Sequence, residues 1–259
     1  MSGRLPGGRT SGPWWQWCPK DFRKEIFIND APTVEQDYSS IHIALLYAMK
    51  DIDYYKDHAG DAYQVGVPDF LKTQKQTRSY AKLLFLMAIN AKTDKKAFAA
   101  FRENRKDKED LEGSRLKDVQ LQVILNSLRA KHPHIADGLG SDAGIKLMNQ
   151  DAQITEHVIR TFTEKGIPVL TLHDSYIVAY GDSPMLDGVL TEAYERLTGF
   201  KTIKSETVGV VFGDEESWKT DRLPEQAMII TNGYKQRLID WLCYKNEIDN
   251  SGSVSIDGG

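Results

Sequence analysis

Residues 169–180 read Val-Leu-Thr-Leu-His-Asp-Ser-Tyr-Ile-Val-Ala-Tyr, and this stretch decides the predicted fold. Two runs rich in β-branched and aromatic residues flank the polar triplet His173-Asp174-Ser175, which predicts a β-hairpin with the triplet at its tip. Gly166-Ile-Pro168 ends the preceding segment, 142–165, whose apolar residues recur at helical spacing. A hairpin that follows a long amphipathic helix favours an α+β fold, with an antiparallel sheet backed by helices.

The chain on both sides of the hairpin alternates between strand and helix patterns. Strands are predicted at 25–30, 32–37 and 202–212. Further helices are predicted from Ser39 onward and over 73–91, 95–126, 186–198 and 234–244. In the 142–165 helix, the residues expected to face the core are Ile145, Met148, Ala152, Ile154, Val158 and Phe162. The stretch up to Pro19 has no periodicity and predicts an irregular loop, in which Trp14, Trp15 and Trp17 either stack on bases or anchor the loop.

Composition narrows the class of protein. The 259 residues are 41% hydrophobic and 27% charged, which is typical of a globular chain and excludes a disordered or fibrous one. No run approaches 18 apolar residues, so we expect no transmembrane helix and no membrane partner, and the N-terminus has no secretory pattern. Cys18 and Cys243 lack zinc-ligand spacing and are too few for a disulfide scaffold, which favours a reducing, cytoplasmic setting.

Positive charge is concentrated in one segment of an acidic chain. The net charge is −4, yet residues 72–117 hold 13 Lys and Arg against 6 Asp and Glu. Such a segment suits a phosphate backbone, but a solvated helical face has the same composition. His132 and His134 flank a proline, and we expect no metal site there because no third ligand has supporting spacing.

Two aspartates stand where a predicted strand ends, although 137 residues separate them. Asp37 precedes a helix and Asp174 lies in the hairpin tip. If the two strands are neighbours, the carboxylates converge, and they then repel each other unless a cation lies between them. Mg²⁺ prefers one or two carboxylates with substrate phosphates. The alternative is that both are turn formers, a common role of Asp at strand ends.

Arg78 and Lys82 lie four residues apart on a predicted helix and so share one face. Two neighbouring cations repel, and a triphosphate lying along that face would relieve the repulsion. A basic face exposed to solvent is the other interpretation.

These stretches resemble, in order, the conserved motifs of family A DNA polymerases. The string Val34-Glu-Gln-Asp37-Tyr38-Ser-Ser-Ile-His42 resembles motif A, Arg78-Ser-Tyr-Ala-Lys82 resembles motif B, and Leu170-Thr-Leu-His173-Asp174-Ser175 resembles motif C. Gly8-Arg9 with Trp15-Gln16-Trp-Cys-Pro19 resembles the stretch that precedes motif A. The resemblance covers about residues 3–180.

The resemblance implies an architecture of palm and fingers. Residues 1–60 and 131–220 would form the palm, an antiparallel sheet backed by helices, and 61–130 a helical fingers insertion. Residues 221–259 would form a C-terminal helix and a flexible tail. The family's thumb precedes motif A, so we expect no thumb here and low processivity.

The resemblance also assigns roles to residues. Asp37 and Asp174 would hold two Mg²⁺ ions, or Mn²⁺, with the backbone carbonyl of Tyr38 as a third contact. Lys82 would approach the triphosphate and protonate the leaving pyrophosphate, while Arg78 would hold the outer phosphates. Contacts with primer or template would come from Arg9 (or Arg4), Gln16 and His173.

Five positions depart from the family pattern. His42 stands where the family has a Glu that helps to exclude ribonucleotides, so the choice of sugar stays open. Leu86, Asn90 and Ala91 stand where motif B has an aromatic residue and then Tyr-Gly, so contacts with the base and template must differ, and Phe85 would be the aromatic substitute. Ser175 replaces a Glu and makes motif C similar to the His-Asp-Ser of single-subunit phage-type RNA polymerases.

The expected function is therefore template-directed nucleotidyl transfer, as a DNA polymerase that uses two-metal phosphoryl transfer to a primer 3′-hydroxyl. Its ligands would be a primer–template and nucleoside triphosphates. A separate thumb, clamp or helicase subunit would be a further partner. The protein would be encoded by a bacterium, a phage or a plasmid. A primase or single-subunit RNA polymerase, a non-catalytic nucleic-acid-binding subunit and a two-metal nuclease are the alternatives.

Overall fold

The computed structural model describes residues 13–23, 26–29, 31–58, 60–172, 174–201 and 205–208, with the single positions 239 and 243. The chain divides into two compact units. The sheet unit takes Met1–Ser39, His157–Leu190 and Ser205–Gly259, and the helical unit takes Ser40–Glu156 and Thr191–Lys204. Two helices, α9 (Gly144–Glu164) and α10 (Ser183–Thr198), each contribute to both units.

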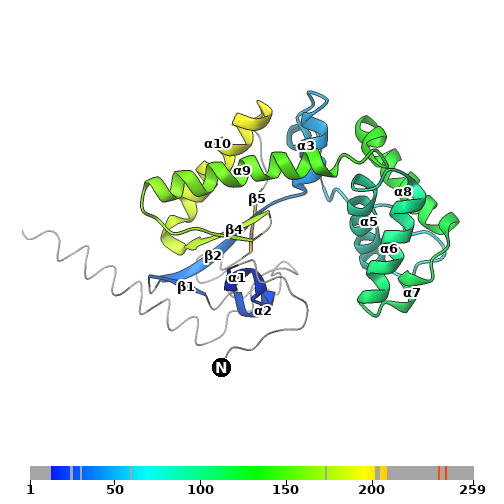
Figure 1. The fold of residues 1–259 in the computed structure, drawn as a ribbon, viewed down its shortest axis with the longest axis horizontal. Coiled ribbons are helices and arrows are strands. Elements are labelled where there is room, and N and C mark those ends of the chain that lie inside the picture. The colour runs from blue at the N-terminus through cyan, green and yellow to red at the C-terminus, as the bar shows by residue number, and fades with distance from the viewer. Residues whose placement is uncertain are drawn as a thin grey trace, which may run out of the picture. The chain divides into compact units, whose positions relative to one another are not determined.

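An antiparallel sheet forms the centre of the sheet unit (Figure 1). Its strands are β1 (Phe27–Ile28), β2 (Ala31–Tyr38), β3 (Leu170–Leu172), β4 (Ser175–Ala179) and β5 (Ser205–Val208). Strand β2 is central, because β4 pairs along one of its edges and β5 along the other, while β3 pairs with β4 as a hairpin. The predicted α+β class, antiparallel sheet and hairpin are confirmed, except that Ser175, expected in the hairpin tip, is the first residue of β4 and pairs with Leu172.

The two faces of β2 are covered by different elements (Figure 1). Side chains alternate between faces along a strand, and Gln36 and Tyr38 point toward α10, where they bond Ser183 and the Leu190 carbonyl. On the opposite face, Arg23 of α2 (Lys20–Arg23) pairs with Glu35 of β2, while α1 (Trp14–Trp17) bonds the Thr171 carbonyl of β3. The irregular loop predicted up to Pro19 is therefore wrong for Trp14–Trp17, which form one helical turn.

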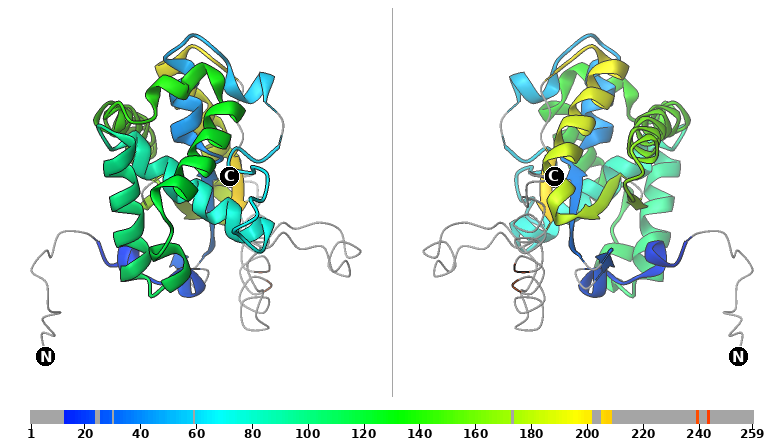
Figure 2. Two further views of the ribbon diagram at one scale, coloured as in Figure 1. Left: turned by 90° about the vertical axis from the view of Figure 1, so that its right-hand side faces the viewer. Right: turned by 90° about the vertical axis from the view of Figure 1, so that its left-hand side faces the viewer.

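The helical unit is built mainly from α5, α6 and α8, which pack on one another, and the left-hand view of Figure 2 faces these helices. Thr73 begins α5 by accepting a hydrogen bond from the Gln76 N–H, as N-cap threonines do. The buried side chains that join the three helices include Leu84, Phe101 and Leu121. The helices and 3₁₀ turns not yet given bounds are α3 (Ile41–Ala48), α4 (Tyr54–Asp57), α5 (Gln74–Ile89), α6 (Asp94–Asp107), α7 (Leu111–Ser114), α8 (Asp118–Lys131), η1 (Pro133–Gly138) and η2 (Tyr180–Asp182).

One continuous helix over 95–126 was expected, and the structure has three instead. The chain turns after α6 at Glu109, whose φ of 58° lies in the left-handed region. Asp110 then caps α7 by accepting a hydrogen bond from the Gly113 N–H, and the Tyr80 hydroxyl of α5 donates to the same carboxylate at 2.8 Å. Contacts between helices therefore stabilise a break in the helix that the sequence of this charged segment does not predict.

The expected core face of α9 is also partly wrong. Ile154, Val158 and Phe162 are buried as predicted, but Ile145 and Met148 are 73% and 65% exposed, and Ala152 is exposed. The buried residue of the first turns is Leu147. Asp151 lies between Leu147 and Ile154 on the buried face of α9 and interrupts the apolar pattern there. The sequence pattern therefore favours the neighbouring face of the helix, which carries Ile145 and Met148.

The predicted bounds of palm and fingers differ from the two units. Residues 40–60 and 131–156, assigned to the palm, lie in the helical unit. The division into palm and fingers stays a prediction. The C-terminal helix expected at 234–244 lies outside the described residues, apart from positions 239 and 243. In the described part of the chain, no helix is both long and apolar enough to cross a membrane.

Candidate active site

The pairing of β2 with β4 brings Asp37 and Asp174 together at one end of the sheet. Asp37 is the Cα partner of Ser175, the first residue of β4, and Asp174 immediately precedes it. Paired Cα atoms of antiparallel strands lie about 4.5–5.5 Å apart and consecutive ones 3.8 Å, so the two aspartate Cα atoms are within roughly 10 Å. Both aspartates are partly exposed. The sheet thus joins two acidic residues that are distant in sequence.

Alternation along β2 places Asp37 on the face that α10 does not cover. Gln36 and Tyr38 are buried against α10, where the Gln36 amide donates to Ser183 Oγ at 3.0 Å and the Tyr38 hydroxyl donates to the Leu190 carbonyl at 2.6 Å. Glu35 and Asp37 consequently face the other way. The Tyr38 ring is only 2% exposed, so only its backbone carbonyl, as predicted, is left for a role in the site.

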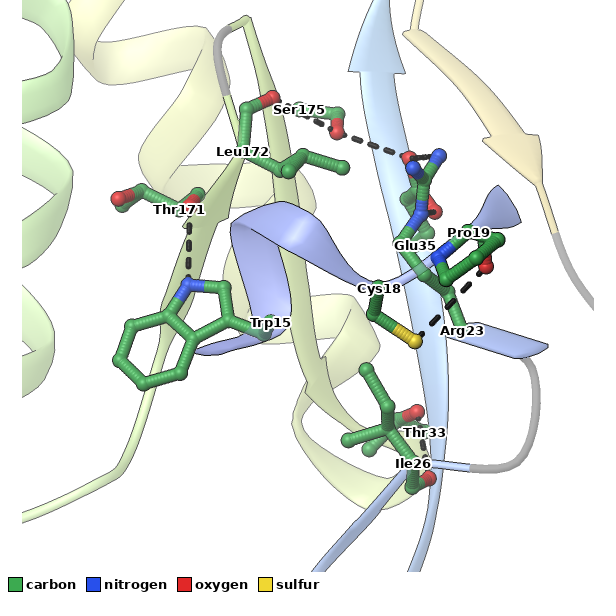
Figure 3. Close-up of polar contacts among 10 residues, drawn as sticks. All are labelled: Trp15, Cys18, Pro19, Arg23, Ile26, Thr33, Glu35, Thr171, Leu172 and Ser175. Carbon is green, nitrogen blue, oxygen red and sulfur yellow. Dashed lines mark hydrogen bonds and ion pairs between the residues drawn. The ribbon is translucent and has the colours of Figure 1, made fainter. Parts of the chain in front are cut away.

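A third carboxylate, Glu35, lies on the same face as Asp37 and was missed by the sequence analysis (Figure 3). Arg23 of α2 pairs with it through two hydrogen bonds, Nε to Oε2 and Nη2 to Oε1, both 3.0 Å long. The Ser175 hydroxyl donates to Glu35 Oε1 at 2.9 Å. The position of Glu35, two residues before Asp37 in a strand, was the available signal.

The donor set matches what Mg²⁺ takes from a protein that also binds phosphates. Within the described ranges, no group of three or more His, Cys, Asp or Glu side chains is arranged to hold a metal ion. Two carboxylates at one strand end form a smaller set, which Mg²⁺ completes with waters and substrate oxygens. Glu35 is already neutralised by Arg23 and is therefore not counted in that set. Asp37 and Asp174 fit a divalent cation.

Arg78 and Lys82 share one face of α5, as the sequence predicted, and both have partners within the helical unit. Arg78 Nε forms an ion pair with Asp61 Oδ2. Lys82 Nζ lies 5.7 Å from the centre of the Tyr63 ring, a cation–π contact. These partners relieve the repulsion between the two cations, so the pair does not by itself require a phosphate. Binding of the triphosphate stays a prediction.

A buried histidine supports the segment that meets these cations. His132 is 1% exposed, and its Nε2 lies 2.8 Å from the carbonyl oxygen of Ala62, between Asp61 and Tyr63. Burial lowers the pKa of His132, which favours the neutral ring. The absence of a metal site at His132 and His134 stays a prediction.

The remaining motif B positions continue along α5. Leu86 is half-buried, and Asn90 is exposed at the helix end, where its amide donates to the Leu86 carbonyl at 2.8 Å. Phe85 is fully buried against Tyr63 and cannot be the aromatic substitute that the sequence suggested for base stacking. His42 is partly exposed on α3. The roles of Leu86, Asn90 and His42 stay predictions.

The stretch before motif A is attached to the hairpin. Trp15 Nε1 and the Gln16 amide both donate to the Thr171 carbonyl, at 3.0 and 3.2 Å (Figure 3). Trp15 therefore anchors the stretch, whereas Trp14 and Trp17 are 63% and 69% exposed and free of that constraint. Contact of Gln16 with nucleic acid stays a prediction. Arg9, Arg4 and His173 lie outside the described residues.

No protein-family model and no curated protein matches the chain. Among solved structures, it is similar to the POL domain of Pol1 from M. smegmatis in complex with DNA primer-template and dNTP, at 11% sequence identity and a TM-score of 0.39. The match covers 70% of this chain and 40% of that one, so the chain spans about two fifths of its neighbour.

Proposed function

We propose that the chain is a template-directed nucleotidyltransferase, a DNA polymerase that extends a primer. The observation that carries the proposal is the strand register Asp37↔Ser175, which brings together the acidic residues of the two stretches that resemble motifs A and C.

Asp37 and Asp174 would hold the divalent cations, two Mg²⁺ in the proposal. When bound, such cations lower the pKa of an attacking hydroxyl and neutralise a triphosphate. The chain's own residues supply the anionic site and a proton. As the primer oxygen bonds to the α-phosphorus, its proton would pass to solvent water, and as the bond to pyrophosphate breaks, Lys82 Nζ would donate a proton to the leaving oxygen.

Arg78 would bind the outer phosphates of the nucleotide in place of its present counterion. Its ion pair with Asp61 is partly exposed, with 40% and 27% of the two side chains accessible. Pairs of this kind contribute about 0.2–1 kcal/mol. A triphosphate, which carries more charge than one carboxylate, can therefore displace Asp61.

The test is primer extension by the purified chain on a labelled primer–template with Mg²⁺. Asp37→Asn and Asp174→Asn keep the side-chain shape but remove the charge, and each should reduce extension at least about 100-fold, because loss of even a partner that orients a metal ligand typically costs 10- to 100-fold. Asp182→Asn, at the far end of β4 in η2, is the matched control and should extend normally. Extension that survives in either site variant would falsify the proposal.

The same assay separates the alternatives. Each nucleotide set is offered in turn, because His42 leaves the choice of sugar open. A strong preference for ribonucleotides would indicate an RNA polymerase or primase. Binding of primed template without any Mg²⁺-dependent product would indicate a non-catalytic subunit, and degradation of the oligonucleotide without added triphosphate would indicate a nuclease.

A further inference from the structure

A network of three side chains ties the motif C hairpin to β2 beside the two aspartates (Figure 3). Arg23 and Glu35 pair through both nitrogens and both oxygens, with only 16% and 12% of their side chains exposed. Bidentate pairs of this kind fix orientation as well as charge. Ser175, which is 5% exposed, adds the link to β4 through its hydroxyl. We call Arg23, Glu35 and Ser175 the clamp.

The Ser175 hydroxyl lies between the hairpin and the central strand. Its Oγ is 2.9 Å from Glu35 Oε1 and 3.1 Å from the carbonyl oxygen of Leu172. Leu172 and Ser175 are Cα partners that flank the turn containing Asp174. A hydroxyl has one proton to donate, so it bonds one acceptor at a time, but both acceptors confine it. The Ser175 hydroxyl thus fixes the position of the turn relative to β2.

The charge of the clamp is balanced. Glu35 and Asp37 are two residues apart on the same strand face, a separation of roughly 7 Å. Without a counterion, Glu35 would add a third negative charge beside the two aspartates and would compete for their cation. Arg23 removes that charge while it leaves Oε1 able to accept from Ser175.

We propose that the clamp positions Asp174 relative to Asp37, so that the two carboxylates bind a divalent cation together. Its members are positioning residues and not ligands. The inference rests on the proposed function, because it assumes that the aspartates hold metal. Partners that orient metal ligands typically contribute 10- to 100-fold to metal affinity.

The experiment measures Mn²⁺ binding to the purified full chain by the loss of the free-ion EPR signal, without nucleotide or nucleic acid. Ser175→Ala removes only the hydroxyl and should raise the Kd for Mn²⁺ about tenfold. Ser175→Thr keeps the hydroxyl and should stay within about twofold of the unmodified chain. Ser183→Ala is the matched control, because it removes a serine bond to β2 from the opposite face, and should leave the Kd unchanged.

Two further variants keep the inference testable if Ser175→Ala does not fold. Glu35→Gln retains an acceptor for Ser175 but leaves the Arg23 charge uncompensated, so Mn²⁺ should bind at least tenfold more weakly. Arg23→Lys keeps the charge but loses the second hydrogen bond, and an intermediate loss is expected. Circular dichroism confirms which variants are folded.

The outcomes distinguish the clamp from the function on which it rests. If the unmodified chain binds no Mn²⁺, or binds it as tightly after Asp37→Asn, the metal site and with it the proposed function fail. If Asp37→Asn abolishes binding but folded Ser175→Ala and Glu35→Gln bind Mn²⁺ like the unmodified chain, the clamp is overturned and the metal site stands.

Discussion

Replacement of His132 by Gln should remove part of the acid sensitivity of the folded chain. His132 is buried, and its two ring nitrogens lie within hydrogen-bonding distance of the Ala62 carbonyl and the Tyr47 hydroxyl. A carbonyl can only accept, so Nε2 carries the proton that bonds Ala62, and Nδ1 accepts from the Tyr47 hydroxyl at 3.2 Å. Gln offers a donor and an acceptor of similar reach but does not titrate between pH 5 and 8.

The sign and size of the effect follow from the lowered pKa of His132. Burial is the main cause of the lowered pKa; the hydrogen bond with the Ala62 carbonyl opposes it, and electrostatic interaction with Lys131 and His58 adds to it. Above pH ~6.5 the ring is neutral in both the folded and the unfolded chain, and the pKa shift has no effect on stability. Below it, the unfolded chain binds a proton that the folded chain does not. The free energy of unfolding then falls by up to about 1.4 kcal/mol per pH unit until the folded-state pKa is reached.

The assay is urea unfolding of the unmodified chain and His132→Gln, followed by far-UV circular dichroism between pH 5.5 and 8. His134→Gln is the control, because His134 is exposed. Between pH 7 and 5.5 the unmodified chain should lose up to about 1.3 kcal/mol more than His132→Gln, whereas His134→Gln should follow the unmodified chain. A difference between the unmodified chain and His132→Gln that does not change with pH would refute the reasoning.

Three further changes have expected outcomes. Tyr38→Phe removes the 2.6 Å hydrogen bond to a buried carbonyl of α10 and should lower the free energy of unfolding by about 1–2 kcal/mol in urea; an unchanged midpoint would contradict that bond. Gly113→Ala would place a Cβ 2.8 Å from Arg105 and Asp110 side-chain atoms and should cost about 1–3 kcal/mol. Gly66→Ala is the control, because its Cβ would meet no atom within 4 Å. Both variants are compared with the unmodified chain by thermal unfolding, and equal losses of stability would show that crowding is not the cause. Asp61→Asn frees Arg78 and should tighten binding of inorganic tripolyphosphate by up to about fivefold in calorimetry; weaker binding would mean that Asp61 orients Arg78 for phosphate.

The elements that the sequence predicted well are those whose signals are local. The hairpin at 170–179 follows from two runs of β-branched and aromatic residues on either side of a polar triplet, and α5 begins after Thr73 because that side chain caps it. The same local patterns were enough to predict that both aspartates lie at strand ends. Each of these predictions depends only on residues that are close together in the sequence.

The elements that it missed depend on residues far away in the chain. The break between α6 and α7 involves Asp110, which Tyr80 bonds from 30 residues upstream. The exposure of Ile145 and Met148 depends on which stripe of α9 meets its neighbours. The sequence of a helix shows which of its side chains are apolar, but it does not show which of them another element covers.

By itself, the sequence determined the kinds of element, their order, and the two acids at strand ends, because backbone preference and side-chain periodicity act over a few residues. Only the tertiary structure decided that Asp37 lies beside Ser175, that Arg23 neutralises Glu35, and that Arg78 pairs with Asp61. Strand register joins residues as far apart as Glu35 and Val208, which are 173 positions apart in the chain. The free energy of such contacts depends on geometry that no local stretch of chain contains.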